Sequence, residues 1–148
     1  MRQQLSSISG GLSPHVDLTY SQAKGRFIFG GDVEGVLRSE RDGFRMGHEL
    51  RINTDLEYVL FPRKYDRPGG EVFAILESNF IRRGTGRIAG APAPGSRSTE
   101  YYLAPGIQYA MRPRFVIEAS YQFPVARDAG PQALLVERGL LVGVRLLY

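Results

Sequence analysis

The chain contains no cysteine, so neither a disulfide framework nor a thiolate metal site is available to it. It also lacks a long hydrophobic run, because no stretch reaches the ~18 apolar residues of a membrane-spanning helix. Its first residues, MRQQLSSISGG, hold no apolar core of the kind found in secretory signals. What remains is a chain of 148 residues, 43% hydrophobic and 23% charged, which is enough for one domain with a core.

Clustered basic charge is missing as well. The net charge is +4, but the basic residues are scattered and no run of Lys and Arg exceeds two. Surfaces that bind nucleic acids gather their basic residues on one face or stripe. The composition therefore indicates that the chain has no nucleic-acid partner.

Helical periodicity is nearly absent, and apolar and polar residues alternate instead. In residues 45–61, RMGHELRINTDLEYVLF, apolar side chains such as Leu50 and Leu56 share one face and Glu49, Arg51 and Glu57 share the other. The same alternation occurs in residues 12–20, 26–38, 71–80, 99–112, 114–123 and 134–148. With no helix between them, these segments predict an antiparallel up-and-down meander of about seven or eight strands, the eighth being a weak candidate near residues 3–9.

Two architectures have this alternation. A soluble sandwich or lipocalin-like barrel turns its apolar face inward, whereas a transmembrane barrel turns the same face outward to lipid. The segments favour the membrane, because none places Asp or Glu on its apolar face and because they reach the about 9–11 residues that cross a bilayer as a strand. We therefore predict an all-β fold, an antiparallel transmembrane β-barrel of the outer membrane.

The aromatic residues predict two girdles around an aliphatic band, as the two interfaces of a bilayer select. With Tyr148 at the periplasmic rim and strand directions alternating backwards from it, one girdle lies at each rim. The periplasmic girdle would contain Tyr20, Phe27, Phe29, Tyr58, Tyr109, Phe115 and Tyr148, and the outer one Phe80, Tyr101, Tyr121 and Phe123. The long basic connection at residues 81–98 then lies outside the cell, where Arg82, Arg83 and Arg87 could meet lipopolysaccharide phosphates or simply belong to a solvated loop.

The last third of the chain, YYLAPGIQYAMRPRFVIEASYQFPVARDAGPQALLVERGLLVGVRLLY, resembles the C-terminal region of Gram-negative outer-membrane β-barrels. It is most similar to the transporter family named after the meta-pathway of phenol degradation. The likeness rests on PGIQY before a short turn, an aromatic followed by PV, and a closing G-x-R-x-x-aromatic strand. The resemblance implies an outer-membrane channel for small, hydrophobic or aromatic solutes, and it implies no catalytic residues.

The end of the chain carries a further part of this resemblance. Gly143, Leu146 and Tyr148 match the closing signal that outer-membrane barrels present to the barrel-assembly machinery, although Leu141 stands where a polar residue is usual. We expect the last strand to be hydrogen-bonded to the first, which removes both sheet edges. Because no signal sequence precedes the strands, we expect residues 1–148 to be a single barrel domain truncated at its N-terminus.

The polar face of the strands supplies the candidate site. We expect a lumen lined by Asp32, Glu34, Arg38, Glu49, Arg51, Asp55, Glu57, Glu77, Arg114, Glu118 and Arg145, with Asp17 and Glu137 also facing inward. These charges could tune the passage of solutes. The alternative is structural, because oppositely charged neighbours on adjacent strands would fill a narrow barrel.

Catalysis is not expected. His15 and His48 are the only histidines, and no nucleophile-elbow pattern accompanies them. Glu49 and Glu57 lie ~26 Å apart along one strand, too far for paired-carboxylate hydrolysis. We expect no metal and no cofactor. The predicted function is passive transport by a channel among outer-membrane lipid and lipopolysaccharide, and the alternatives are a non-conducting structural or adhesive barrel and a soluble lipocalin-like binder.

Overall fold

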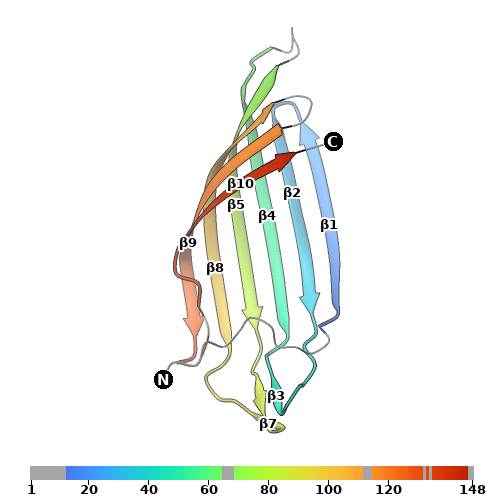
Figure 1. Cartoon of the computed structure of the whole chain (residues 1–148), viewed down its shortest axis with the longest axis vertical. Helices are drawn as coiled ribbons and strands as arrows, with labels where there is room; N and C mark the ends of the chain where they lie inside the picture. The colour runs from blue at the N-terminus through green and yellow to red at the C-terminus, as the bar shows by residue number, and fades with distance from the viewer. Residues whose placement is uncertain (1–12, 65–68, 112–114, 132, 134, 147–148) are drawn as a thin grey trace.

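The computed structural model describes residues 13–64, 69–111, 115–131, 133 and 135–146. It contains one seven-stranded sheet in the order β1-β2-β4-β5-β8-β9-β10 and a three-stranded sheet in the order β3-β6-β7 (Figure 1). The long strands are β1 (His15–Lys24), β2 (Phe27–Val36), β4 (Glu49–Phe61), β5 (Gly70–Arg83), β8 (Ser98–Met111), β9 (Phe115–Ala129) and β10 (Gly139–Leu146). The short ones are β3 (Phe44–Arg45), β6 (Arg87–Ile88) and β7 (Ala91–Pro92).

The long sheet confirms the predicted antiparallel meander. Each long strand pairs antiparallel with its neighbour in the sequence of long strands. None of the described residues belongs to a helix that could span a bilayer. The candidate eighth strand near residues 3–9 lies outside the described residues.

The prediction that the last strand pairs with the first is not met by the described residues. There, β1 and β10 are the two edges of the sheet, and each has one hydrogen-bonded neighbour. An odd number of strands in strict antiparallel order makes the first and the last run in the same direction, as the arrowheads of β1 and β10 do in Figure 1. Direct closure would therefore require a parallel pair, whereas one further strand between them would be antiparallel to both.

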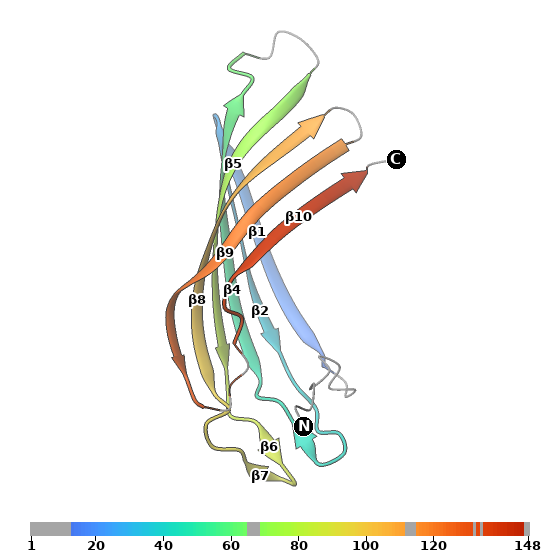
Figure 2. The ribbon, with the colours of Figure 1, turned by 60° about the vertical axis from the view of Figure 1, so that its left-hand side comes forward.

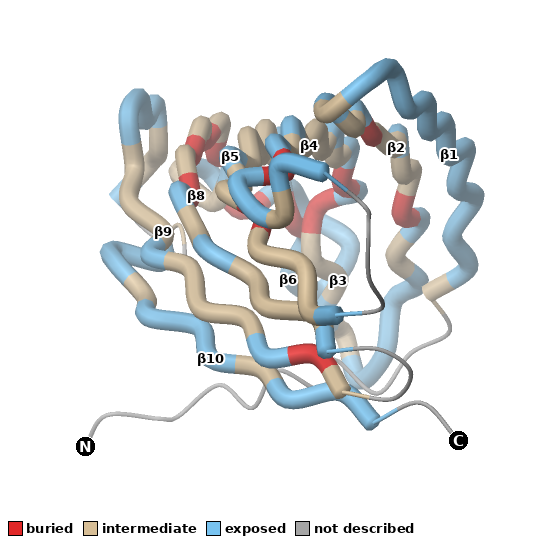
Figure 3. The backbone as a smooth tube through the Cα atoms, turned by 90° about the horizontal axis from the view of Figure 1, so that it is seen from above, coloured by how far each residue is buried: buried red, intermediate tan, exposed pale blue. Residues whose placement is uncertain are grey.

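The long sheet curls strongly. Figure 2 shows β9 and β10 curving away from the direction of β4 and β5, and the view from above in Figure 3 shows the sheet curling round from β1 through β4 and β5 to β10. Strand twist and coiling produce such curvature. The sheet thus has a convex and a concave face, and alternate residues of each strand belong to each.

The convex face is apolar and exposed. Large apolar side chains on it include Val16, Leu18, Tyr20, Phe27, Phe29, Val33, Leu50, Ile52, Leu56, Tyr58, Leu76, Ile107, Ile117, Leu140, Val142, Val144 and Leu146. Val16 is 79% exposed at the edge strand, and Leu76 is 44% exposed even in the middle of the sheet. In the described strands, the charged side chains on this face are Lys24, Arg82 and Asp128, and all three lie at or next to strand ends. The polar face is therefore the inner one.

The longer connections gather at one end of the sheet. Residues 37–48, 84–97 and 130–138 connect strands there, whereas Gly25 and Arg26 alone connect β1 to β2 at the other end. The first two connections are joined, because β3 pairs with β6 (Figure 1). Gly47 packs so closely on the backbone of Gly84 that a side chain there would collide with its carbonyl oxygen. The expectation of a simple loop over residues 81–98 is therefore wrong, since the chain there ends β5, forms β6 and β7 and begins β8. The residues of β6 and β7 are nevertheless exposed.

The last strand is shorter than predicted. It begins at Gly139 rather than near residue 134, and Gly139 lies opposite Gln122. β9 continues to Ala129 with β8 as its only partner over that stretch. Residues 135–138, which we call the strap, thus leave the sheet. Glu137 was expected on the last strand, and the structure places it in the strap instead.

Candidate functional site

The concave face lines an open hollow of about 700 Å³ in the middle of the sheet. Its lining includes six of the predicted lumen residues, namely Asp32, Asp55, Glu57, Glu77, Glu118 and Arg145. Asn53, Asn79, Gln108 and Ser120 also line it. The hollow is therefore polar, and its charged groups are mainly carboxylates.

The carboxylates of the hollow belong to adjacent strands. Asp55 on β4 is the direct cross-strand neighbour of Glu77 on β5, and like charges in that position repel. Glu118 on β9 has a cation nearby, because Arg145 of β10 lies 3.7 Å from it. The Arg145 side chain is 64% and the Glu118 side chain 41% exposed, so solvent screens this pair and it is worth little. Excess negative charge thus remains on the hollow's wall.

Glycines make room for two of these carboxylates. A Cβ on Gly30 of β2 would collide with the Asp55 carboxylate, and a Cβ on Gly143 of β10 would lie 2.7 Å from Oε1 of Glu118. Each carboxylate therefore lies over the backbone of the neighbouring strand. Gly143 was predicted from its place in a closing motif, and in the structure it also accommodates Glu118.

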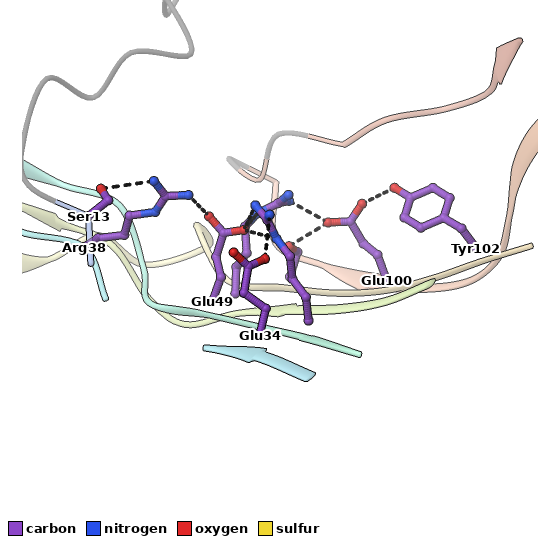
Figure 4. A network of polar contacts seen from close by, with 9 residues as sticks. Ser13, Glu34, Arg38, Glu49, Glu100 and Tyr102 are labelled. Atoms are coloured by element: carbon purple, nitrogen blue, oxygen red, sulfur yellow. Dashed lines mark hydrogen bonds and ion pairs between the residues drawn. The ribbon is translucent and has the colours of Figure 1, made fainter. Parts of the chain in front are cut away.

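A belt of ion pairs crosses the concave face at the end with the longer connections (Figure 4). The ion-pair belt consists of Glu34, Arg38, Glu49, Arg51, Arg83 and Glu100. The Glu49 side chain is only 2% exposed and receives Arg38 at 2.5 Å, Arg51 at 2.9 Å and Arg83 at 3.5 Å. Three guanidinium groups around one carboxylate offset the cost of burying it.

Arg83 extends the belt to β8. Its Nη1 donates to Oε1 of Glu100 at 2.8 Å, so it bridges two buried carboxylates on different strands. Glu100 also accepts from the Ser98 hydroxyl at 2.9 Å and from the Tyr102 hydroxyl. Ser98, Glu100 and Tyr102 are each at most 2% exposed. This part of the concave face is tightly covered.

The strap provides part of that cover. The carbonyl oxygen of Val136 lies 3.0 Å from the Tyr102 hydroxyl and also accepts from Nη2 of Arg127. The Arg127 guanidinium stacks on the Tyr102 ring, 5.7 Å from its centroid. Arg127 of β9 and Tyr102 of β8 thus hold the strap against the concave face. The strap therefore does not continue the β9–β10 hairpin as a strand.

Toward the opposite end of the concave face, three apolar side chains are buried beside Gln108 and Glu71. Val59 of β4 and Phe73 of β5 are direct cross-strand neighbours, and with Val116 of β9 they are each less than 10% exposed. The acidic hollow therefore lies between these buried apolar side chains and the ion-pair belt at the end with the longer connections.

The structure groups the predicted site residues in two places. Six line the hollow, and Glu34, Arg38, Glu49 and Arg51 belong to the ion-pair belt. Arg114 and Tyr148 lie outside the described residues, and Leu146 is exposed on the convex face. Glu100 and Tyr102 were not among the predicted site residues, and Arg83 was named only as a candidate for lipopolysaccharide phosphates, whereas it pairs with Glu49 and Glu100. Glu100 and Tyr102 share the polar parity of β8, a signal that was present in the sequence.

The described residues offer no group of three or more histidines and carboxylates arranged to hold a metal ion. His48 instead accepts from the backbone N–H of Arg38 at its Nδ1, 3.0 Å away, which ties the 37–48 connection to the start of β4. Comparisons with protein-family models, with curated proteins and with solved structures return no match to this chain. The resemblance to the phenol meta-pathway transporter family therefore stays a prediction.

Proposed function

We propose that this chain is part or all of an outer-membrane β-barrel and that its concave face lines a passive path for small polar solutes. The single observation that carries the proposal is the inverted distribution of side chains, apolar on the exposed convex face and charged on the concave one. A large apolar side chain gains roughly 1.5–3 kcal/mol on leaving water. Summed over the exposed apolar side chains of the convex face, the free energy gained by contact with lipid exceeds the net stability of a typical domain, which is about 5–15 kcal/mol.

The solute class follows from the lining. Carboxylates, amides and hydroxyls surround the hollow, and among the described residues that line it the cation is Arg145. Such a lining suits water, inorganic cations and small polar molecules. It favours them over the hydrophobic or aromatic solutes that the family resemblance implies.

A second candidate function is a non-conducting structural barrel. It is favoured by the two packed regions that flank the hollow, because Glu49 and Glu100 of the ion-pair belt are buried on one side and Val59, Phe73 and Val116 on the other. Barrels of about eight strands are filled by their side chains, whereas larger ones leave a channel. Both the channel and the structural barrel would be inserted in the outer membrane, and only the channel would conduct ions.

Two measurements test the proposal on the full chain. Folding into detergent and then vesicles should give a band on gels that shifts on heating, and the chain should float with the vesicles. A chain that stays soluble and monomeric without detergent would instead support the lipocalin-like alternative. In planar bilayers, stepwise conductance supports the channel, and inserted protein without conductance supports the structural barrel.

A further inference from the structure

Two arginines at the rim of the sheet differ from those of the ion-pair belt. Arg38, Arg51 and Arg83 are each matched to a buried carboxylate. Arg82, next to Arg83, and Arg97, which precedes β8, are exposed and have no hydrogen bond or ion pair within the described part of the chain. Their guanidinium groups are therefore available to an external anion.

Both arginines line one hollow of about 300 Å³. The hollow also has Gly84, Thr85, Thr99 and Asp128 in its wall. Thr99 lies between Arg82 and Asp128 in the register of β5, β8 and β9, so these three side chains form a row across the convex face. Guanidinium and hydroxyl donors that converge on a space of this size suit a phosphate group, which accepts several charge-assisted hydrogen bonds.

The position of the hollow beside Arg82 and Arg97 favours a lipid headgroup as the source of such a phosphate. Phe80 and Tyr101 are direct cross-strand partners on the same convex face, one step closer to the middle of the sheet than Arg82 and Thr99. The exposed side chain of Leu50 lies opposite Arg82 on β4. Aromatic residues mark the interface of a bilayer, and lipid phosphates lie just outside the hydrocarbon boundary.

We propose that Arg82 and Arg97 bind the phosphate monoester of a lipid headgroup in the outer leaflet. This proposal rests on the proposed membrane location of the convex face. Asp128 is the one carboxylate in the wall, and it makes no ion pair with either arginine in the described residues, so a net positive charge remains. Removing that carboxylate should strengthen phosphate binding, and removing the two cations should weaken it.

The test uses the full chain folded in detergent and titrated with three probes: diphosphorylated lipid A, the same lipid without phosphates, and inorganic phosphate. The wild type should bind the phosphorylated lipid in preference to both other probes. The double variant R82Q/R97Q should bind it about tenfold or more weakly, and Asp128→Asn should bind it roughly two- to threefold more tightly. Arg63→Gln is the matched control, because Arg63 is exposed just after β4, at the opposite end of the sheet, and does not line the hollow.

The outcomes separate this site from the proposed function. If the chain inserts into vesicles and R82Q/R97Q binds phosphorylated lipid as the wild type does, the site is wrong and the membrane proposal stands. Equal binding of inorganic phosphate would overturn the lipid headgroup as the source. A chain that never enters detergent or vesicles overturns both proposals. Because Arg82 and Arg97 are exposed, the heat-induced gel shift of the double variant should match the wild type and show that it folds.

Discussion

The hydroxyl of Tyr102 on β8 lies 3.0 Å from the carbonyl oxygen of Val136, which is 34 residues further along the chain. This contact joins the strap to the buried group on the concave face that Tyr102 forms with Glu100 and Ser98. It also explains why β10 starts late, because the residues that could have extended the β9–β10 hairpin are held against β8 instead.

Tyr102→Phe should therefore loosen the strap. The variant removes a hydroxyl shared between the buried Glu100 carboxylate and the strap, at a cost of about 1–3 kcal/mol. We expect faster tryptic cleavage after Arg138 in the folded protein. The matched control is Tyr101→Phe. The Tyr101 hydroxyl lies on the convex face, away from the strap, and accepts a hydrogen bond from Ser78 at 2.9 Å. Equal cleavage rates for both variants would show that Tyr102 does not hold the strap.

Glu49→Gln should destabilise the sheet strongly. It leaves Arg38, Arg51 and Arg83 without their shared carboxylate in a buried position, and breaking a buried pair from one side costs about 3–5 kcal/mol. Urea unfolding followed by the heat-modifiable gel band would measure the loss. Glu34→Gln is the control, because Glu34 is 21% exposed and, within the described part of the chain, its ion pair is with Arg51, so its loss should cost about 1 kcal/mol or less. An equal effect of both variants would contradict the central role of Glu49.

Two alanine substitutions in β2 should act in opposite directions. Gly30→Ala adds a methyl group where the Asp55 carboxylate lies and pushes it toward Glu77, so we expect a loss of about 1 kcal/mol. Gly35→Ala meets nothing within 4 Å and restricts the unfolded chain, which should add about 0.4–1 kcal/mol. The difference between their urea midpoints is the measurement. A stabilising Gly30→Ala would mean that Asp55 does not need the space above Gly30.

A charge on the convex face should oppose insertion. Leu76→Arg places a cation in the middle of the apolar face, where arginine costs about 2–4 kcal/mol in a bilayer. Asn79→Arg places the same group on the concave face beside the acidic residues, and we expect it to be tolerated. Vesicle flotation and refolding yield compare the two. If Asn79→Arg is the more damaging variant, the convex face does not contact lipid.

The acidic hollow should make conduction prefer cations. This prediction rests on the proposed channel and is measured as the reversal potential in a salt gradient across a planar bilayer. The double variant Asp55→Asn with Glu77→Gln removes one directly paired set of carboxylates, so the reversal potential should move toward zero. Glu40→Gln, an exposed change in the 37–48 connection, should leave it unchanged. A reversal potential that is the same in all three proteins would exclude the hollow as the filter.

The strand segments and their faces were predictable because side-chain alternation is a local property. In residues 45–61, for example, the alternation alone assigns Leu56 to one face and Asp55 to the other, and β4 has that arrangement. The same reasoning placed Glu77 and Glu118 on one face with Asp55. Six of the predicted lining residues consequently meet in the hollow.

The partners of these residues were not predictable in the same way. Arg83 follows Arg82 in a basic stretch that reads as a loop, yet it ends β5 and bridges Glu49 and Glu100 from two other strands. Which charges become neighbours depends on strand register, and register is set by pairing between distant segments. The strap was missed for a related reason, since residues 134–138 alternate well enough to be taken for a strand.

The sequence by itself determined that the chain is all-β, that its strands follow one another antiparallel, and which side chains share a face. These properties follow from a repeat of two residues that needs no partner to be recognised. The tertiary structure alone decided that β1 and β10 run in the same direction as sheet edges, that the strap folds onto Tyr102, and that Glu49 and Glu100 share Arg83. Those features depend on the number and curvature of the strands and on contacts between residues far apart in the chain, which a local pattern does not encode.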